Sequence, residues 1–273
     1  MRGVWKRNYG QVTRAPPDER GGNRQTEPNV TAPHLYSTLT PRIMRQVVVA
    51  SFTDFIKHTD IFDLFVELVV FRGQPVEGNL LPDLVRQEPT KNPLPKERKI
   101  YQQLRLLGAA LLSNAEATHR DLMVLAQHFG LKTRLLDWST NPLVALWFAC
   151  ADKSQGDAFV YALEADLHMD ADPYAVGPKG LVETRVFQPR FNNPRIIAQQ
   201  GWFTLHQYSA KDKRFVSIER NAKMRNQLHE FRIPAENRPD ILRSLDRHGI
   251  NARTLYPDLQ GLCAYLNWKH SEA

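Results

Sequence analysis

Residues 127–141 carry the side chains of this chain that are best suited to chemistry. An amide, an imidazole, a hydroxyl, a guanidinium, a carboxylate and an indole lie here, on Gln127, His128, Thr133, Arg134, Asp137 and Trp138. Leu131, Leu135 and Leu136 are interspersed among them, and a fully solvated loop would not carry so many apolar residues. Buried polar groups must satisfy one another or meet a ligand. The stretch therefore predicts a rigid, half-buried polar wall of a pocket for a polar small molecule.

Several of these side chains have a structural alternative beside the chemical one. His128 titrates near neutral pH, which makes it a candidate acid or base, but at the end of a predicted helix it can also complement the helix dipole. Arg134 and Asp137 are candidates to orient His128. They would instead form a local ion pair if the turn between them were helical. Trp138 either stacks on a ligand ring or fills the core.

Arg72 is a further candidate for ligand binding, because it directly follows a hydrophobic strand. It belongs to the motif Phe-Arg-Gly-Gln at 71–74. A planar guanidinium at a strand end is suited to phosphate or carboxylate, and Gly73 permits close approach of a ligand or of another chain segment. The alternative is that Arg72 pairs with an internal acid such as Asp137.

Residues 181–230 combine positive charge with aromatic side chains. Nine Lys and Arg stand against four acids there, with Phe, Trp and Tyr between them. This composition suits single-stranded nucleic acid, whose bases stack and whose phosphates are neutralised, although a solvated basic face over aromatic core residues explains it as well. The whole chain has a net charge of +7 and a pI near 9.5, which favours phosphate-rich partners or simply solubility.

The elements that position these groups follow from hydrophobic periodicity. Helices are expected at 42–57, 96–114, 117–129, 143–151 and 240–248, with a last helix ending near 268. Strands are expected at 66–71, 157–163, 184–186, 202–205, 216–218 and 230–233. The proline-rich residues 73–95 are expected to be irregular. Helices concentrated in the first half, followed by strands, predict an α+β fold.

The length and composition of the chain suggest one globular domain with an appendage. Residues 1–33 lack apolar periodicity and hold six Arg and Lys against three acids. We expect a disordered basic arm there, followed by a single domain at 34–273. Cys150 and Cys263 lie in apolar contexts typical of core residues in a reducing compartment. Neither a transmembrane segment nor a secretory signal is recognisable, so a cytoplasmic protein without membrane contact is expected.

Several common catalytic motifs are absent from the sequence. It contains no P-loop, no glycine-rich dinucleotide fingerprint, no His-Glu-x-x-His, no Cys-x-x-Cys and no nucleophile elbow. Tight acidic clusters that would hold two metal ions are also missing. These absences exclude P-loop enzymes, zinc proteins and standard serine hydrolases, and no metal site is expected.

Four segments of the chain resemble the FRG domain family, which is named for its Phe-Arg-Gly motif. They are 71–74 with 80–82, 125–138 with 141–142, 194–203, and 255–262. The second segment is the most specific, although Lys132 stands where the family usually has a small residue or proline. The resemblance covers residues 50 to about 266 and identifies the chain as a member of this family.

The resemblance implies a fold and a chemistry similar to those of ADP-ribosyltransferase toxins. The fold would be a split mixed or antiparallel β-sheet with a helical insertion in the first half. The reaction would break the nicotinamide–ribose bond of NAD through an oxocarbenium-like state, as in glycoside cleavage. Arg72 would bind the pyrophosphate, Asp137 would activate the nucleophile and Trp138 would contact the nicotinamide. The other implied site residues are His128 and Arg134 in catalysis and Gln74, Gln127, Thr133 and Gln200 in NAD binding.

One feature of such transferases has no clear counterpart here. They usually place a glutamate late in the sheet, where this chain has Gln199 and Gln200, with Glu219 and Glu230 as distant alternatives. The basic composition favours a nucleic acid as the acceptor, RNA before DNA. Members of the family occur in bacterial defence and toxin–antitoxin settings, which implies a neutralising antitoxin as a partner. A metal-independent ribonuclease that uses His128 and Arg134, and a non-catalytic nucleotide- or RNA-binding module, remain as alternatives.

Overall fold

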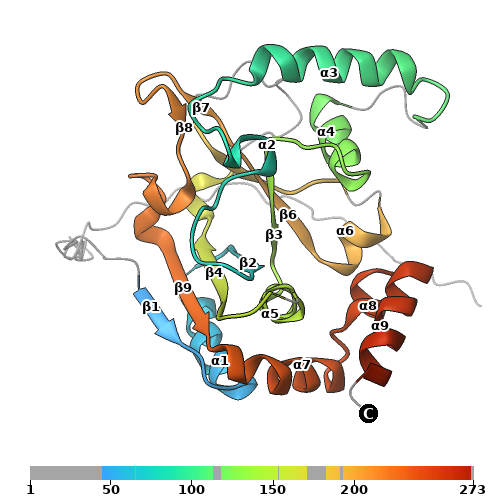
Figure 1. The fold of residues 1–273 in the computed structure, drawn as a ribbon. Helices are drawn as coiled ribbons and strands as arrows, with labels where there is room; N and C mark the ends of the chain where they lie inside the picture. Colours follow the sequence, from blue (N-terminus) through green and yellow to red (C-terminus); the bar gives the residue numbers. More distant parts are fainter. Residues whose placement is uncertain are drawn as a thin grey trace, which may run out of the picture. The chain divides into compact units, whose positions relative to one another are not determined.

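A seven-stranded mixed sheet organises the fold (Figure 1). The computed structural model describes residues 45–64, 66–112, 118–152, 154–170, 183–190 and 193–271. The expected basic arm at 1–33 lies outside them. The sheet has the strand order β1-β9-β4-β2-β3-β6-β5, in which only β1 and β9 are parallel neighbours. The strands are β1 (Arg45–Val48), β2 (Val69–Gln74), β3 (Leu135–Ser139), β4 (Ala158–Glu164), β5 (Arg185–Phe187), β6 (Gly201–Leu205) and β9 (Leu228–Ile233). A separate hairpin joins β7 (Tyr208–Ser209) to β8 (Arg214–Phe215).

Helices of very different length surround this sheet. They are α1 (Phe52–Thr59), α2 (Asp83–Arg86), α3 (Leu94–Leu107), α4 (His119–His128), α5 (Pro142–Ala151), α6 (Pro194–Ala198), α7 (Arg238–Arg247), α8 (Ala252–Leu255) and α9 (Leu259–Ser271). Short 3-10 turns lie at Asp60–Leu64, Asp166–His168, Ile218–Arg220, Arg225–Gln227 and Ala235–Asn237. Within the described ranges, no helix combines the length and the apolar character that crossing a bilayer requires.

Two apolar layers lie on opposite faces of the central strands. On one face α1, α5 and α7 pack against β2, β4 and β9, around core residues such as Phe55, Leu146 and Phe231. Helix α5 is the central helix of this layer, because its sequence is almost entirely apolar and it contacts both β2 and β4. On the other face the strand residues Leu136 and Trp138 pack with side chains from turns rather than from long helices.

The sheet splits between β2 and β3. These two strands share a single paired position, Phe71 with Ser139, whereas β2 pairs with β4 over its whole length and β3 pairs with β6 over its whole length. Beyond the shared position the two strands part, and the side chains of Arg72 and Asp137 lie at the point where they do so. This opening places polar side chains on an otherwise apolar scaffold.

The sequence-based expectation of an α+β fold is confirmed, but two expected elements are wrong and a central strand was not predicted. The helix expected at 42–57 begins only at Phe52, capped by Ser51, whose hydroxyl accepts from the Asp54 N–H at 3.1 Å. The β-branched residues before it form β1 instead, because they pair with β9. No strand forms at 216–218, where Val216 and Ser217 are irregular and Ile218 begins a 3-10 turn. Residues 135–139, in a stretch read as a polar wall without a strand, form β3.

Gly73 lets helix α5 lie directly on strand β2. A Cβ atom built at this position would lie 1.8 Å from the carbonyl oxygen of Ala145 and 2.6 Å from the nitrogen of Ala149. We expect Gly73→Ala to destabilise the fold by about 3 kcal/mol, because the backbone of α5 must move to accept the methyl group. In Gly201→Ala the nearest atom to the new Cβ is 3.5 Å away, so this variant should stay within about 1 kcal/mol of wild type. Urea denaturation of both measures the difference, and equal midpoints would contradict the packing argument.

Candidate functional site

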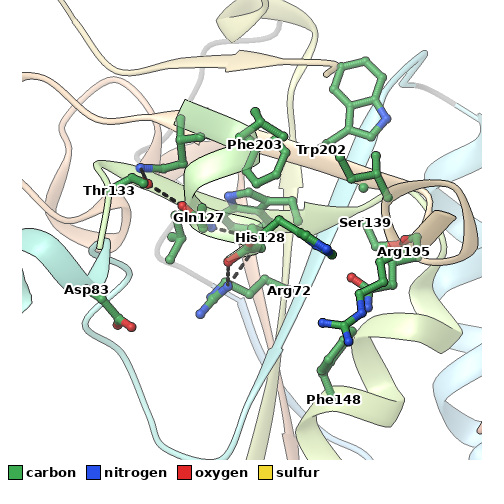
Figure 2. Close-up of a pocket in the computed structure, with 18 of the residues that line it drawn as sticks. Arg72, Asp83, Gln127, His128, Thr133, Ser139, Phe148, Arg195, Trp202 and Phe203 are labelled. Atoms are coloured by element: carbon green, nitrogen blue, oxygen red, sulfur yellow. Dashed lines mark hydrogen bonds and ion pairs between the residues drawn. The ribbon is translucent and has the colours of Figure 1, made fainter. Parts of the chain in front are cut away.

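A cavity of about 490 Å³ opens where β2 and β3 part (Figure 2). Its walls come from β2, β3, β6, the end of α4 with the loop that follows it, α2, α5, α6 and the residue after α8. The polar side chains lining it are Arg72, Asp83, Arg86, Gln127, His128, Lys132, Thr133, Asp137, Ser139, Gln199 and Arg195. The aromatic side chains lining it are Phe71, Trp138, Phe148, Trp202, Phe203 and Tyr256. Polar and aromatic side chains together suit a polar ligand that contains a ring.

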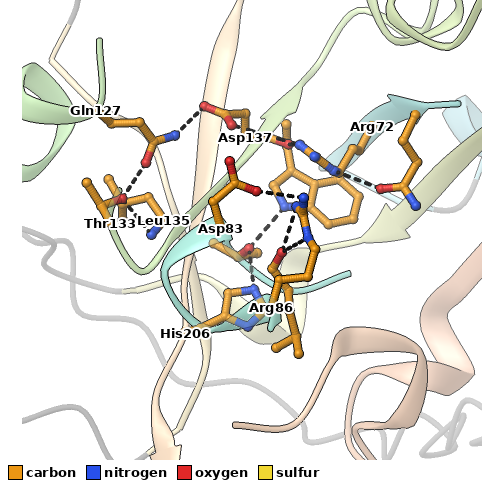
Figure 3. A network of polar contacts seen from close by, with 12 residues as sticks. Arg72, Asp83, Arg86, Gln127, Thr133, Leu135, Asp137 and His206 are labelled. Atoms are coloured by element: carbon orange, nitrogen blue, oxygen red, sulfur yellow. Dashed lines mark hydrogen bonds and ion pairs between the residues drawn. The ribbon is translucent and has the colours of Figure 1, made fainter. Parts of the chain in front are cut away.

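A chain of hydrogen bonds fixes the polar centre of the cavity (Figure 3). Arg72 Nη1 donates to the carbonyl oxygen of Asp137 at 2.9 Å and lies 3.9 Å from its carboxylate Oδ2. The other carboxylate oxygen accepts from Gln127 Nε2 at 2.7 Å. Gln127 in turn accepts from the hydroxyl of Thr133, which accepts from the Leu135 N–H at 3.0 Å. The carboxylate is thereby oriented from both sides while its outer edge faces the cavity.

The charges of Arg72 and Asp137 are only partly compensated. The Asp137 side chain is 63% exposed, yet it is exposed to a concave cavity whose protein walls limit its hydration. Desolvation raises the pKa of the Asp137 carboxyl, and the attraction of Arg72 and the Gln127 hydrogen bond only partly oppose this rise. Desolvation likewise lowers the pKa of Arg72. A carboxylate of raised basicity beside a guanidinium is a suitable proton acceptor.

Gln74 does not line the cavity and instead holds Arg72. Its side-chain oxygen accepts from Arg72 Nε at 3.3 Å, and its amide nitrogen donates to the carbonyl oxygens of Val76 at 2.9 Å and Gly78 at 2.6 Å. Buried to 7% exposure, it connects Arg72 to the turn after β2. The structure therefore gives Gln74 a positioning role in place of the expected contact with a ligand.

His128 faces the cavity from the end of α4 and keeps its hydrogen-bonding capacity free. Neither of its ring nitrogens has a hydrogen-bond partner among the described residues, and its ring contacts that of Phe129 edge-on. Desolvation, and next the positive charge of Arg195, lower the pKa of the imidazole. At neutral pH it presents one N–H donor and one acceptor to a ligand.

Arg134 lies away from the cavity, and the ion pair with Asp137 that a helical turn would have produced is not formed, because residues 135–139 are a strand. In strand geometry the side chains of neighbouring residues alternate between faces, and Arg134 enters the protein interior with 1% exposure. There it forms an ion pair with Glu97 at 2.9 Å and donates to His206 O at 3.1 Å and Gln207 Oε1 at 2.9 Å. Its charge is satisfied internally, so direct contact with a ligand in the cavity is excluded in this conformation.

Gln200 also lies outside the cavity lining. It follows α6 with a left-handed backbone (φ 47°), and its side chain accepts from the hydroxyl of Thr140 at 3.4 Å. The other candidates for a late acid are occupied elsewhere. Glu219 accepts from the backbone of Asn79 and Leu80 at 3.0 and 3.1 Å, and Glu230 is buried. The carboxylates that line the cavity among the described residues are those of Asp83 and Asp137.

Trp138 fills the core, which is one of the two roles considered for it, and it also lines the cavity. Its indole N–H donates to Thr204 Oγ1 at 3.0 Å, and this oxygen lies 3.1 Å from His206 Nε2. His206 is fully buried, and desolvation, followed by the charges of Arg72 and Arg134, lowers its pKa to about 3. A neutral imidazole is therefore linked through Thr204 to the cavity residue Trp138.

The burial of His206 predicts a loss of stability in acid. The unfolded chain takes up a proton near pH 6.5 that the folded chain takes up only near pH 3, so acidification between these values favours unfolding. We expect this residue to account for about 1.4 kcal/mol per pH unit below pH 6.5. Urea denaturation at pH 7, 6 and 5 should show a shallower decline for His206→Gln than for wild type. Parallel declines would contradict a neutral buried His206.

Several cavity residues were not predicted from the sequence. Arg195 and Tyr256 lie in segments that carried the family resemblance, but nothing in their local pattern marked them as ligand-facing. Asp83 and Arg86 come from a short helix inside a region expected to be irregular, and pair with each other at 2.6 Å. The described residues contain no group of three or more His, Cys, Asp or Glu that could hold a metal ion.

The comparison with known families identifies the scaffold of this cavity. Residues 67–158 match the model of the FRG domain. The chain carries an FRG domain. The match spans β2, α4, β3 and α5, and thus both strands that part to form the cavity. Arg195 and Tyr256 lie beyond the matched part of the FRG domain. No curated protein and no solved structure matches the chain.

Proposed function

We propose that this FRG protein is an ADP-ribosyltransferase-like enzyme that uses NAD and transfers ADP-ribose to a nucleic acid. The observation that carries the proposal is the pairing of Arg72 with Asp137 at the floor of a cavity with aromatic walls. An anion-binding guanidinium, a basic carboxylate and rings beside them are the groups that cleavage of a nicotinamide–ribose bond requires.

The reaction assigns a step to each of these groups. The acceptor forms a bond to C1′ of the ribose while the bond from C1′ to the nicotinamide nitrogen breaks and nicotinamide leaves with the electron pair. Asp137 takes the proton that the acceptor loses. Arg72 binds the pyrophosphate through the N–H groups that Asp137 and Gln74 leave free. Trp202, Phe203 or Trp138 supplies an aromatic wall for the nicotinamide ring.

The ribonuclease alternative has less support from this geometry. It requires His128 and Arg134 to act on one phosphodiester, but Arg134 is buried against Glu97 and only His128 reaches the cavity. The lack of a glutamate among the described cavity residues leaves Asp137 as the carboxylate nearest to Arg72. In our proposal Asp137 therefore replaces the late glutamate of related transferases.

The proposal is tested with NAD labelled in its adenylate part. Purified protein is incubated with this NAD and with separate pools of RNA, DNA and protein, and nicotinamide release is followed in parallel. We expect label in the RNA pool, and a loss of label and of nicotinamide release in Arg72→Ala, with Arg232→Ala as a surface control. No nicotinamide release by the folded wild-type protein would refute the proposal, and binding of NAD without turnover would indicate a non-catalytic module.

A further inference from the structure

One end of the cavity offers hydrogen-bond donors that none of the described residues uses. Figure 2 shows Arg195 and Phe148 at this end and Asp83 at the other, with Arg72 between them. Arg195 donates through Nε and Nη2 to Asp258 Oδ2, at 3.2 and 2.6 Å. Its Nη1 has no hydrogen-bond partner among the residues that the structure describes. A guanidinium edge with two free N–H groups thus faces the cavity.

This guanidinium is held in place before any ligand arrives. Its carbon lies 5.0 Å from the centre of the Tyr256 ring, and the ion pair with Asp258 fixes the opposite edge. Asp258 is itself fixed, because its other oxygen accepts from the Gly261 N–H at 2.8 Å at the start of α9. An arginine clamped in this way loses little side-chain entropy when it binds an anion.

His128 lines this end of the cavity, and the ring of Phe129, which is outside the lining, contacts it edge-on. The unpartnered ring of His128 lies close enough to Arg195 and Asp258 for both charges to act on its ionisation. Phe129, which lies in sequence between the cavity residues His128 and Gly130, is 78% exposed. An exposed aromatic ring beside free cationic and neutral donors provides a stacking surface next to a phosphate site.

We propose that Arg195, His128 and Phe129 form a subsite that binds one nucleotide of a single-stranded nucleic acid, the acceptor of the reaction. Arg195 Nη1 and His128 bind its phosphate, and the base stacks on Phe129. The role as acceptor rests on the proposed function. The subsite belongs to the same cavity as the Arg72–Asp137 pair, because Arg195 and His128 line that cavity together with Arg72 and Asp137. A nucleotide bound there presents its sugar or base to the carboxylate that takes the proton.

The surroundings favour nucleic acid over a protein acceptor. The chain carries a net charge of +7, and Lys132, an exposed cation, lines the same cavity. A phosphate backbone gains from these charges, whereas most protein acceptors do not. The exposed aromatic ring of Phe129 can stack on a nucleobase.

Binding of a labelled oligonucleotide without NAD tests the subsite separately from catalysis. Fluorescence anisotropy with a 5′-fluorescein single-stranded RNA of mixed sequence, and with the matching DNA, is measured over a range of salt concentrations. Arg195→Gln should weaken binding about tenfold and reduce the slope of log affinity against log salt by about 0.7, the contribution of one phosphate contact to a single strand. Arg214→Gln, an exposed arginine outside the cavity lining, should leave both quantities unchanged.

Phe129→Ala provides a second variant that cannot act through an ion pair. It should weaken binding about tenfold while keeping the wild-type salt slope, because stacking releases no counterions. Leu107→Ala, which removes another highly exposed apolar side chain (84%), is its control. Since the ring of Phe129 is exposed, the variant should keep the wild-type melting temperature.

The outcomes separate the subsite from the proposed function. Nicotinamide release by a wild-type protein that binds no oligonucleotide overturns the subsite and leaves NAD cleavage intact. If the two variants lose oligonucleotide binding as described but the wild-type protein does not cleave NAD, the subsite is supported and the transferase is overturned. Wild-type affinity and salt slope in both Arg195→Gln and Phe129→Ala overturn the subsite, as does label from NAD that appears only in protein.

Discussion

Replacing Asp137 by asparagine is expected to lower the rate of nicotinamide release from NAD by a factor of about 10² to 10⁴, the usual contribution of a general base. The substitution keeps the size of the side chain and its hydrogen bond from Gln127, but removes the charge that accepts the proton. Steady-state kinetics with saturating NAD measure the effect as a fall in kcat. An unchanged kcat would exclude Asp137 as the base.

The other carboxylate of the cavity serves as the matched control. Asp83 pairs with Arg86 within one helical turn and is 62% exposed, and it makes no hydrogen bond with Arg72 among the described residues. We expect Asp83→Asn to lower kcat less than tenfold. A larger loss in Asp83→Asn than in Asp137→Asn would reverse the roles of the two acids.

The pH dependence of the reaction rate provides a second test of the role of Asp137. Activity requires the ionised carboxylate, so the rate should fall as the pH drops through the pKa of this group, which desolvation places above the usual range of aspartate. The Gln127 hydrogen bond lowers this pKa. In Gln127→Leu the acid limb of the pH–rate profile should therefore move to higher pH.

The fold class could be predicted from sequence because most elements carry their own periodic signal. Helix α4 and helix α5 begin where Thr118 and Asn141 cap them, and both caps are recognisable in sequence. Strand β3 could not be recognised in the same way. Residues 136–139 do alternate, with Leu136 and Trp138 in the core and Asp137 and Ser139 lining a cavity. The strand is only five residues long, however, and directly follows the polar residues 132–134, so the sequence pattern predicts a polar wall there.

The parts of the site that could be predicted are those that lie within single sequence motifs. Arg72 and Asp137 are 65 residues apart in sequence, but each lies in a conspicuous motif, so both could be found separately. Arg195 and Tyr256 approach the same cavity only because the chain returns to it after β5 and again after α7. The inward orientation of the Arg134 side chain could not be predicted either, because its partner Glu97 lies 37 residues earlier in the sequence, on α3.

Arg134 and Glu97 are expected to contribute more to folding than any exposed ion pair of the described chain. Glu97→Ala should lower the free energy of unfolding by about 3–5 kcal/mol, because it leaves a buried guanidinium without its counter-charge. Burial raises the pKa of Glu97 even though Arg134 opposes the rise, which indicates how strongly the interior disfavours a single charge there. Urea denaturation measures the loss. Glu88→Ala, which breaks the exposed pair with Lys91, should cost less than about 1 kcal/mol.

A double substitution distinguishes a structural from a catalytic Arg134. Glu97→Leu combined with Arg134→Met removes both charges, so it should be considerably more stable than the sum of the two single losses predicts. If this double variant folds and still releases nicotinamide from NAD, Arg134 acts only by holding α3 against β3 and the turn after β6. If it folds with wild-type stability but has lost activity, Arg134 takes part in the chemistry through a conformation in which it leaves Glu97. The expected result is the first, because the polar contacts that Arg134 makes with described residues all go to Glu97, His206 and Gln207.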